Sequence, residues 1–172
     1  MTGTPRDVSC SFGRAVPADA PAIAALRNAV AEDLTARYGH GHWSSKVTER
    51  GVVRSLERSL ILVARCDEGI VGVLTLGARK PWAIDPAYFH AVSRPLYLTD
   101  MAVQPGVQRR GLGRRLVARA IAAAREWPAG AIRLDAYDAP AGAGDFYARC
   151  GFTEVGRVTY RGTPLVYFER LL

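Results

Sequence analysis

A short glycine-rich loop holds the residues whose types and spacing point most directly to chemistry. The segment Gln108-Arg109-Arg110-Gly111-Leu112-Gly113 lies between an apolar run and a stretch of helical periodicity. Glycines let a backbone approach a ligand closely, and free amides at a helix N-terminus attract phosphate because the helix dipole is positive there. The neighbouring arginines offer charge-assisted hydrogen bonds to the same group. The loop therefore predicts a phosphate site, although a plain tight connection between strand and helix gives a similar pattern.

Two common phosphate loops fit this segment poorly, because no Gly-Lys-Ser/Thr follows and no Gly-x-Gly-x-x-Gly is present. The segment instead resembles the acyl-CoA loop of the GCN5-related N-acetyltransferase (GNAT) superfamily, in which Gln or Arg, two residues, Gly, one residue and Gly or Ala follow one another. The strand end at residues 101–103 and the run FYARCGF at residues 146–152 also resemble motifs of that family. The resemblance implies acetyl-CoA as the acyl donor, bound by Met101, Ala102, Val103, Gln108, Arg109, Arg110, Gly111, Leu112, Gly113, Arg114, Phe146 and Tyr147.

Two positions qualify this resemblance. Phe146 has packing in the core as its alternative role. Pro140 stands where the family often has an asparagine, six residues before the Phe of Phe-Tyr, that contacts the cofactor arm. That contact is therefore expected to be lost or replaced.

Tyrosine and aspartate side chains supply the candidate proton-transfer groups. In the superfamily an amine attacks the thioester directly, so the enzyme must take a proton from the amine and protonate the departing thiolate. The resemblance places Tyr147 near the sulfur as general acid, with packing as its alternative. Asp100, at the end of the central strand, is the candidate base, although strand alternation turns it away from the site unless a bulge intervenes. For Asp100, a substrate anchor and a structural carboxylate are the alternatives to the base, and Asp135 and Asp138 are further candidates for the base.

Two aromatic segments, residues 38–43 and 81–90, are candidates for the wall of an acceptor site. Closure of the core over the sheet is their alternative. Aromatic rings with a carboxylate would suit a small cationic amine. His40 and His42 are spaced like half of a metal site, but no further ligand set is apparent, so no metal is predicted. The predicted substrate-binding residues are Trp82, Asp85, Tyr88, Trp43 and Asp135.

The composition is that of an ordinary globular protein. A chain of 172 residues with 49% hydrophobic and 23% charged residues suits one domain, 1–172, with residues 1–10 as a flexible tail. No membrane-spanning run and no signal segment are apparent, so a cytoplasmic protein is expected. The three cysteines are an odd number without paired spacing, which indicates neither a disulfide framework nor a zinc site.

The periodicity predicts an α+β fold. Strands are expected at residues 11–15, 60–66, 70–76, 96–103, 131–136, 153–160 and 165–170. Helices are expected after Asp19, within residues 46–59, from Gly113 to Pro128 and around Tyr147. The resemblance implies the GNAT acyl-CoA N-acyltransferase fold, with a mostly antiparallel twisted sheet of about six to seven strands flanked by helices.

Three functions remain open at this point. The first is transfer of an acetyl group from acetyl-CoA to the primary amine of a small molecule. The second has aminoacyl-tRNA or a protein amine as acceptor, and the third is a non-catalytic acyl-CoA-binding module. The net charge of +7 is dispersed, with crowding at residues 109–115 that the cofactor partly explains, so no nucleic-acid partner is expected. No membrane partner is expected either, and a homodimer is left open.

Overall fold

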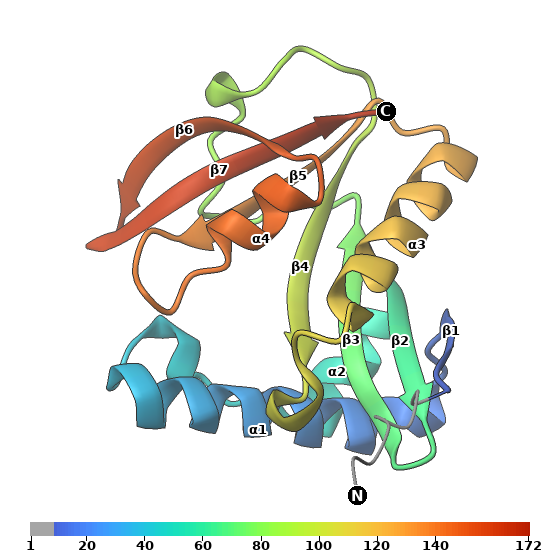
Figure 1. The fold of residues 1–172 in the computed structure, drawn as a ribbon. Coiled ribbons are helices and arrows are strands. Elements are labelled where there is room, and N and C mark those ends of the chain that lie inside the picture. The colour runs from blue at the N-terminus through green and yellow to red at the C-terminus, as the bar shows by residue number, and fades with distance from the viewer. Residues whose placement is uncertain (1–8) are drawn as a thin grey trace, which may run out of the picture.

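The computed structural model describes residues 9–172, which form a seven-stranded sheet with helices on both faces (Figure 1). The helices and strands are Ser11–Arg14 (β1), Ala20–Tyr38 (α1), Glu49–Leu56 (α2), Leu60–Cys66 (β2), Gly69–Gly77 (β3), Pro95–Val103 (β4), Leu112–Glu126 (α3), Ala131–Tyr137 (β5), Gly144–Arg149 (α4), Thr153–Tyr160 (β6) and Thr163–Leu171 (β7). These bounds confirm the predicted α+β class and the mostly antiparallel sheet.

The order of the strands across the sheet is β1-β2-β3-β4-β5-β7-β6. All neighbouring strands pair antiparallel except β4 and β5, which pair parallel over Pro95↔Ala131, Leu96↔Ile132 and Tyr97↔Arg133 only. Beyond Tyr97 the two strands separate, and β4 continues toward α1 while β5 bends away with β7 and β6 (Figure 1). The sheet is therefore open along the second half of β4.

Side chains alternate between two apolar cores, as a two-sided sheet requires. Ile61, Val63 and Val73 pack with α1 and α2 on one face. Leu62, Ala64 and Leu74 pack with α3 on the other face. This division fixes α1 and α3 on opposite faces of the sheet beside the diverging ends of β4 and β5.

The cysteines correct one expectation from the sequence. Cys10 and Cys66 form a disulfide, with their Cα atoms 4.3 Å apart. The register of β1 on β2 pairs Ser11 with Arg65, so the next residues outward lie opposite each other. That register is a tertiary property which spacing along the chain does not show.

Two further predictions concern the N-terminal tail and membrane-spanning segments. The predicted tail falls mainly on residues 1–8, which lie outside the described residues, while Cys10 is held by its disulfide. No helix within residues 9–172 is both long enough and apolar enough to cross a membrane.

Candidate active site

A cavity of about 490 Å³ occupies the gap where β4 and β5 diverge. Its walls come from α1, from the loop between α1 and α2, from the ends of both strands and from α4. Six of the predicted site residues line this one space: Trp43, Asp100, Met101, Ala102, Asp135 and Tyr147. The open sheet thus brings together side chains that are more than 100 residues apart in the chain.

A bulge in β4 sets the position of Asp100. Val73 pairs with Ala102 and Thr75 pairs with Thr99, so two residues of β4 lie opposite Leu74 alone. Asp100 has a left-handed backbone with φ of 53°, a conformation that non-glycine residues rarely adopt. Its carboxylate accepts a hydrogen bond from Arg27 Nη2 of α1 at 2.6 Å. The bulge therefore turns Asp100 toward the cavity, where a guanidinium holds it.

Asp135 lies across the cavity from Asp100, on β5. Its carboxyl is mostly buried, and this desolvation raises its pKa above the ordinary value because water no longer stabilises the charge. Tyr137, two residues further along the same strand, has a raised pKa for the same reason and because Asp135 lies near it. A carboxylate with a raised pKa accepts a proton more readily than an exposed one.

Tyr147 reaches the cavity from α4 while its ring stays buried. Phe146, Phe152 and Phe168 surround the ring, with centroids 5.2 to 6.2 Å away. Its hydroxyl lies 3.7 Å from the sulfur of Met101, which is a weak acceptor. Burial, with smaller contributions from Cys150 and Asp135, raises the pKa of Tyr147 far above its usual value. The phenol therefore stays protonated at neutral pH and can donate.

The predicted phosphate loop has the geometry of an anion site. Gly111 (φ 81°) and Arg109 (φ 62°) are both left-handed, and Gly111 at the N-cap of α3 has no side chain to cap that helix. Within residues 9–172 no hydrogen bond is made by the amides of Leu112, Gly113 or Arg114, so they are free for an acceptor. The site residues Arg109, Arg110 and Arg114 are exposed around them.

Two contacts hold this loop against β4. Gln108 Nε2 donates to the carbonyl of Val103 at 2.9 Å. A Cβ on Gly113 would lie 3.1 Å from Met101 and 3.2 Å from Phe146, so only glycine fits there without displacement. The loop, the end of β4 with Ala102, and α4 therefore meet, and they place the free amides beside the cavity that Tyr147 lines.

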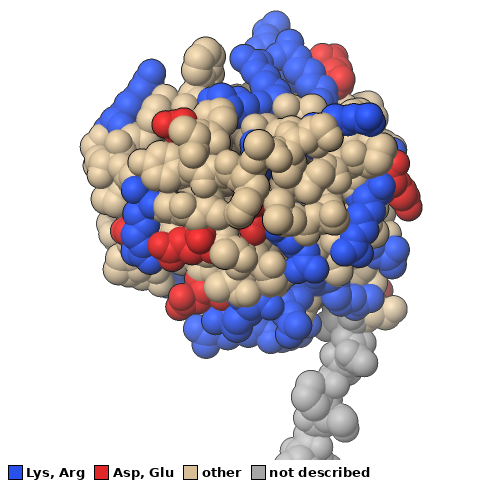
Figure 2. All heavy atoms as spheres, turned by 90° about the horizontal axis from the view of Figure 1, so that it is seen from above, with Lys and Arg blue, Asp and Glu red and all other residues tan. Residues whose placement is uncertain are grey.

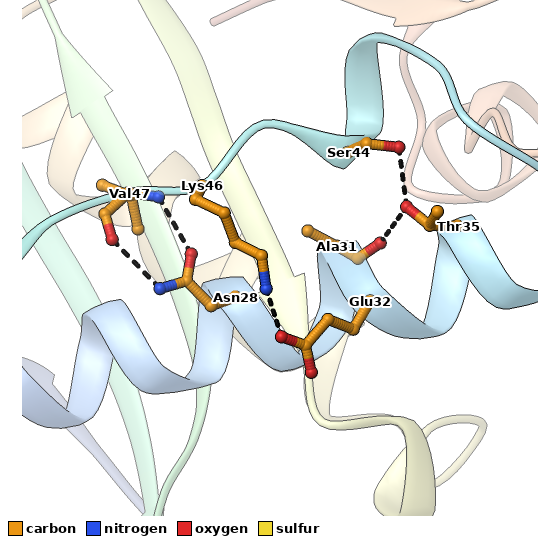
Figure 3. Close-up of polar contacts among 7 residues, drawn as sticks. All are labelled: Asn28, Ala31, Glu32, Thr35, Ser44, Lys46 and Val47. Atoms are coloured by element: carbon orange, nitrogen blue, oxygen red, sulfur yellow. Dashed lines mark hydrogen bonds and ion pairs between the residues drawn. The ribbon is translucent and has the colours of Figure 1, made fainter.

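The loop between α1 and α2 forms the opposite wall of the cavity and is held firmly (Figure 3). Asn28 of α1 donates to the carbonyl of Val47 at 3.0 Å and accepts from its amide at 2.9 Å, as a neighbouring strand would. Thr35 bonds to Ser44, and Lys46 pairs with Glu32. Contacts within the chain therefore hold this wall in place.

An aromatic contact joins the two sides of the cavity. Trp43 of this loop meets Tyr137 of β5 edge to face, with ring centroids 5.5 Å apart. Trp43 Nε1 also donates to the carbonyl of Gly39 at 3.0 Å, which fixes the indole. Such a pair is worth about 0.5–1.5 kcal/mol beyond its buried area. The contact bridges the gap that the diverging strands leave.

The other aromatic segment lies elsewhere. Tyr88 packs edge to face on Tyr167, Asp85 accepts from the amide of Ala87, and Trp82 is 82% exposed. None of these three lines the cavity. The hydroxyl of Tyr167 accepts from the amide of Asp85 and donates to the carbonyl of Ala83, so this loop is held on β7. The assignment of Trp82, Asp85 and Tyr88 to the acceptor site therefore remains a prediction. Their position outside the cavity gives it no support.

Among the cavity residues that the sequence did not identify, Arg27 and Tyr137 contribute a charge and an aromatic contact to its wall. Arg27 follows Ile23 and precedes Ala31 at four-residue spacing, so a charge interrupts the buried stripe of α1. That interruption is a signal that sequence reasoning could have used. Tyr137 gave no such signal, because its role depends on the approach of Trp43.

Comparisons with known proteins agree with this geometry. The family model described as an acetyltransferase (GNAT) domain matches residues 57–154. The fold is similar to the ribosomal-protein-alanine N-acetyltransferase of Brucella melitensis, with a TM-score of 0.74, 22% identity, and 94% of this chain and 99% of that chain covered.

Two structures solved with a ligand are also similar in fold. YncA of Salmonella typhimurium, solved with acetyl-CoA, has a TM-score of 0.69 and 20% identity, covering 95% of this chain and 94% of the other. The PaiA N-acetyltransferase of Thermoplasma acidophilum, in complex with coenzyme A, has a TM-score of 0.74 and 14% identity, covering 95% and 99%.

Proposed function

Because the chain belongs to the GNAT acetyltransferase family and is an N-acetyltransferase that uses acetyl-CoA as its acyl donor, we propose that its acceptor is the primary amine of a small molecule. The observation that most directly supports this proposal is the cavity of about 490 Å³ between β4 and β5. It has buried proton-transfer groups, and the contact of Trp43 with Tyr137 bridges its two sides. A space of this size suits a small ligand.

The residues around the phosphate loop fit the donor. The free amides of α3 and the exposed Arg109, Arg110 and Arg114 would hold its pyrophosphate. The end of β4, where no strand pairs on the β5 side, offers the backbone of Met101 and Val103 to the pantetheine arm. Bound acetyl-CoA supplies a thioester whose carbonyl carbon the amine attacks and whose C–S bond then breaks.

The proton transfers are assigned to two side chains. The Asp135 carboxylate takes one proton from the acceptor ammonium and passes it to solvent. Tyr147 donates its hydroxyl proton to the departing sulfur and regains one from the nitrogen that has formed the amide, through solvent. One proton is released overall for each amine acetylated. Asp100 is the less suitable base, since Arg27 already occupies one of its oxygens.

A protein amine is the second candidate acceptor, because two of the similar structures are ribosomal-protein-alanine N-acetyltransferases. A polypeptide N-terminus would have to enter the same cavity, whose wall includes Trp43 and Tyr137. For aminoacyl-tRNA the surface charge is the relevant observation. On the face shown in Figure 2 the Lys and Arg side chains stand mostly around the edge rather than forming one continuous tract, and a tract is what a nucleic-acid backbone requires.

A competition experiment tests the choice of acceptor. The enzyme is incubated with acetyl-CoA and an equimolar mixture of small amines, peptides with free N-termini and aminoacyl-tRNA, and the acetylated products are identified by mass spectrometry. The proposal predicts that kcat/KM for the best small amine exceeds that for every peptide by at least about tenfold. A peptide or aminoacyl-tRNA as the preferred substrate would contradict it.

A further inference from the structure

We propose that Arg27 binds a carboxylate on the acceptor, and hence that the small amine is a zwitterion of the amino-acid class. This inference rests on the proposed function and extends it to the identity of the acceptor. It depends on three observations: a guanidinium on the inward side of α1, a carboxylate held beside it by an unusual backbone, and the position of both in the cavity wall.

The first observation is the placement of Arg27. It lies on the stripe of α1 that carries the buried residues Ile23 and Ala31, where an apolar side chain would pack at less cost. Its side chain is 27% exposed, and it lines the cavity. A guanidinium has five N–H donors, and within the described residues only Nη2 makes a side-chain hydrogen bond, to Asp100. The remaining donors are available to a ligand.

The second observation is the backbone of Asp100. Its φ of 53° places an aspartate in the left-handed region in the middle of a strand, which is a strained position. The ion pair that results is about a third exposed, and such pairs contribute little to stability. Stability of the fold therefore gives no reason for the bulge. Presentation of a carboxylate beside the Arg27 guanidinium in the cavity wall does give one.

The third observation is that the ion pair of Arg27 and Asp100 lies in the cavity wall, where it presents both charges to a ligand. An ammonium that approaches Asp100 also approaches Arg27, whose charge repels it. A carboxylate on the same ligand turns that repulsion into attraction, because it binds the free side of the guanidinium. The amine can then lie between Asp100 and Asp135, the group assigned as base. An amino acid has the two charges at this close spacing, whereas a simple amine or a diamine has one sign only.

The experiment compares acceptors that differ only in the carboxylate. Initial rates of CoA release are measured for the common L-α-amino acids and for their C-terminal carboxamides, with wild type, Arg27→Gln and Arg27→Lys. The expected result is that wild type prefers the best amino acid over its amide by at least about tenfold in kcat/KM. In Arg27→Gln this ratio should fall to about one, and in Arg27→Lys it should take an intermediate value, because lysine keeps the charge and loses the planar fork.

Arg37→Gln is the matched control. Arg37 lies on the same helix and also pairs with an aspartate, Asp33, but it does not line the cavity. The ratio should be the same in this variant as in wild type. Thermal unfolding of each variant, and titration of the amino acid into the complex of the protein with desulfo-CoA, separate a lost binding site from a lost fold.

Two results would overturn the inference and leave the proposed function intact. One is turnover of amides or diamines at rates equal to or above those of amino acids. The other is an unchanged ratio in a folded Arg27→Gln protein. Failure to acetylate any small amine, while acetyl-CoA still binds, would overturn the proposed function and the inference together.

Discussion

At the scale of single residues, the proposed proton transfers depend on two side chains whose burial changes their pKa values. Asp135 and Tyr147 both have a raised pKa because the cavity wall keeps water from them. A carboxylate with a raised pKa is a better base, and a phenol with a raised pKa remains a hydrogen-bond donor. Asp100 has the same chemical type as Asp135, and its guanidinium partner gives it a different role.

Removal of the Tyr147 hydroxyl should lower turnover and leave donor binding unchanged. General acid effects are typically about 10²- to 10⁴-fold, so Tyr147→Phe should lower kcat at least about tenfold. Stability should change little, because the hydroxyl makes only a long contact to the Met101 sulfur. Tyr38→Phe, an exposed tyrosine at the end of α1, is the control. Turnover within twofold of wild type across the pH range would restrict Tyr147 to packing.

Asp135→Asn should abolish the acidic limb of the pH profile of kcat/KM. The limb reports protonation of the base, and the raised pKa of Asp135 places it above the range of an ordinary carboxyl. An amide cannot accept the proton, so the limb that reports Asp135 should disappear, and the remaining activity should follow only the ionisation of the acceptor amine. Asp100→Asn should keep the limb and raise KM instead. If the acidic limb is instead lost in Asp100→Asn and retained in Asp135→Asn, then Asp100 is the base and Asp135 is not.

The pH dependence of stability gives a control for that variant. The pKa of Asp135 is higher in the folded state than in the unfolded chain. Its contribution to stability is therefore present below the unfolded pKa and lost as the pH rises through the folded pKa. At neutral pH the buried charge of Asp135 destabilises the fold, so the Tm of Asp135→Asn should equal or exceed that of wild type. The difference between the two Tm values should become smaller as the pH is lowered. A much lower Tm at neutral pH would show that the carboxylate is structural.

At the scale of elements, the bulge in β4 and the N-terminus of α3 do most to position the chemistry. The bulge turns Asp100 toward α1, and the loop before α3 presents three free amides. Both use backbone conformations that ordinary strands and helices lack, at Asp100 and at Gly111.

Gly111→Asp should lower the affinity for acetyl-CoA by at least about a hundredfold in isothermal titration. Any side chain at φ of 81° is strained, and a carboxylate there would repel the pyrophosphate. Gly106→Asp is the matched control, since Gly106 precedes the loop, has open space around it and has no positive φ. If the two variants bind acetyl-CoA with equal affinity, this loop does not bind the pyrophosphate.

Sequence patterns predicted most of these elements, because periodicity and turn residues are local. Leu60–Cys66 and Thr153–Tyr160 match the predicted bounds, and the loop before α3 was found from its glycines. The features missed depend on contacts distant in sequence, although the charge of Arg27 within the apolar stripe of α1 was a local signal. The disulfide follows from the β1–β2 register, Arg27 meets Asp100 across 73 positions, and the loop holding Trp82 is held by Tyr167.

At the scale of the whole molecule, the divergence of β4 and β5 creates the site, and the contact of Trp43 with Tyr137 joins its two sides. Trp43 comes from the half of the molecule formed by α1 and α2, and Tyr137 from the half formed by β5, β7 and β6. Under the proposed function, acceptor choice depends on how the two halves meet.

Trp43→Ala removes this aromatic contact, so the enzyme should discriminate less strongly between small amines and peptides. We expect KM for the small amine to rise about tenfold, KM for acetyl-CoA to stay within twofold, and the rate with peptides to rise relative to the rate with small amines. Trp127→Ala is the control, because Trp127 is 60% exposed at the end of α3 and does not line the cavity. If both variants have the acceptor preference of wild type, the aromatic bridge does not select the acceptor.

The most direct test of the central claim is to follow the acetyl group itself. The enzyme is mixed with acetyl-CoA labelled with ¹³C in the acetyl group and with the best small amine, and product and protein are examined by mass spectrometry. The account predicts that the label appears on the amine nitrogen, that one CoA is released for each acetylated amine, and that the protein carries no label. Bound acetyl-CoA that keeps its label in the presence of every small amine, or label retained on the protein, would contradict it.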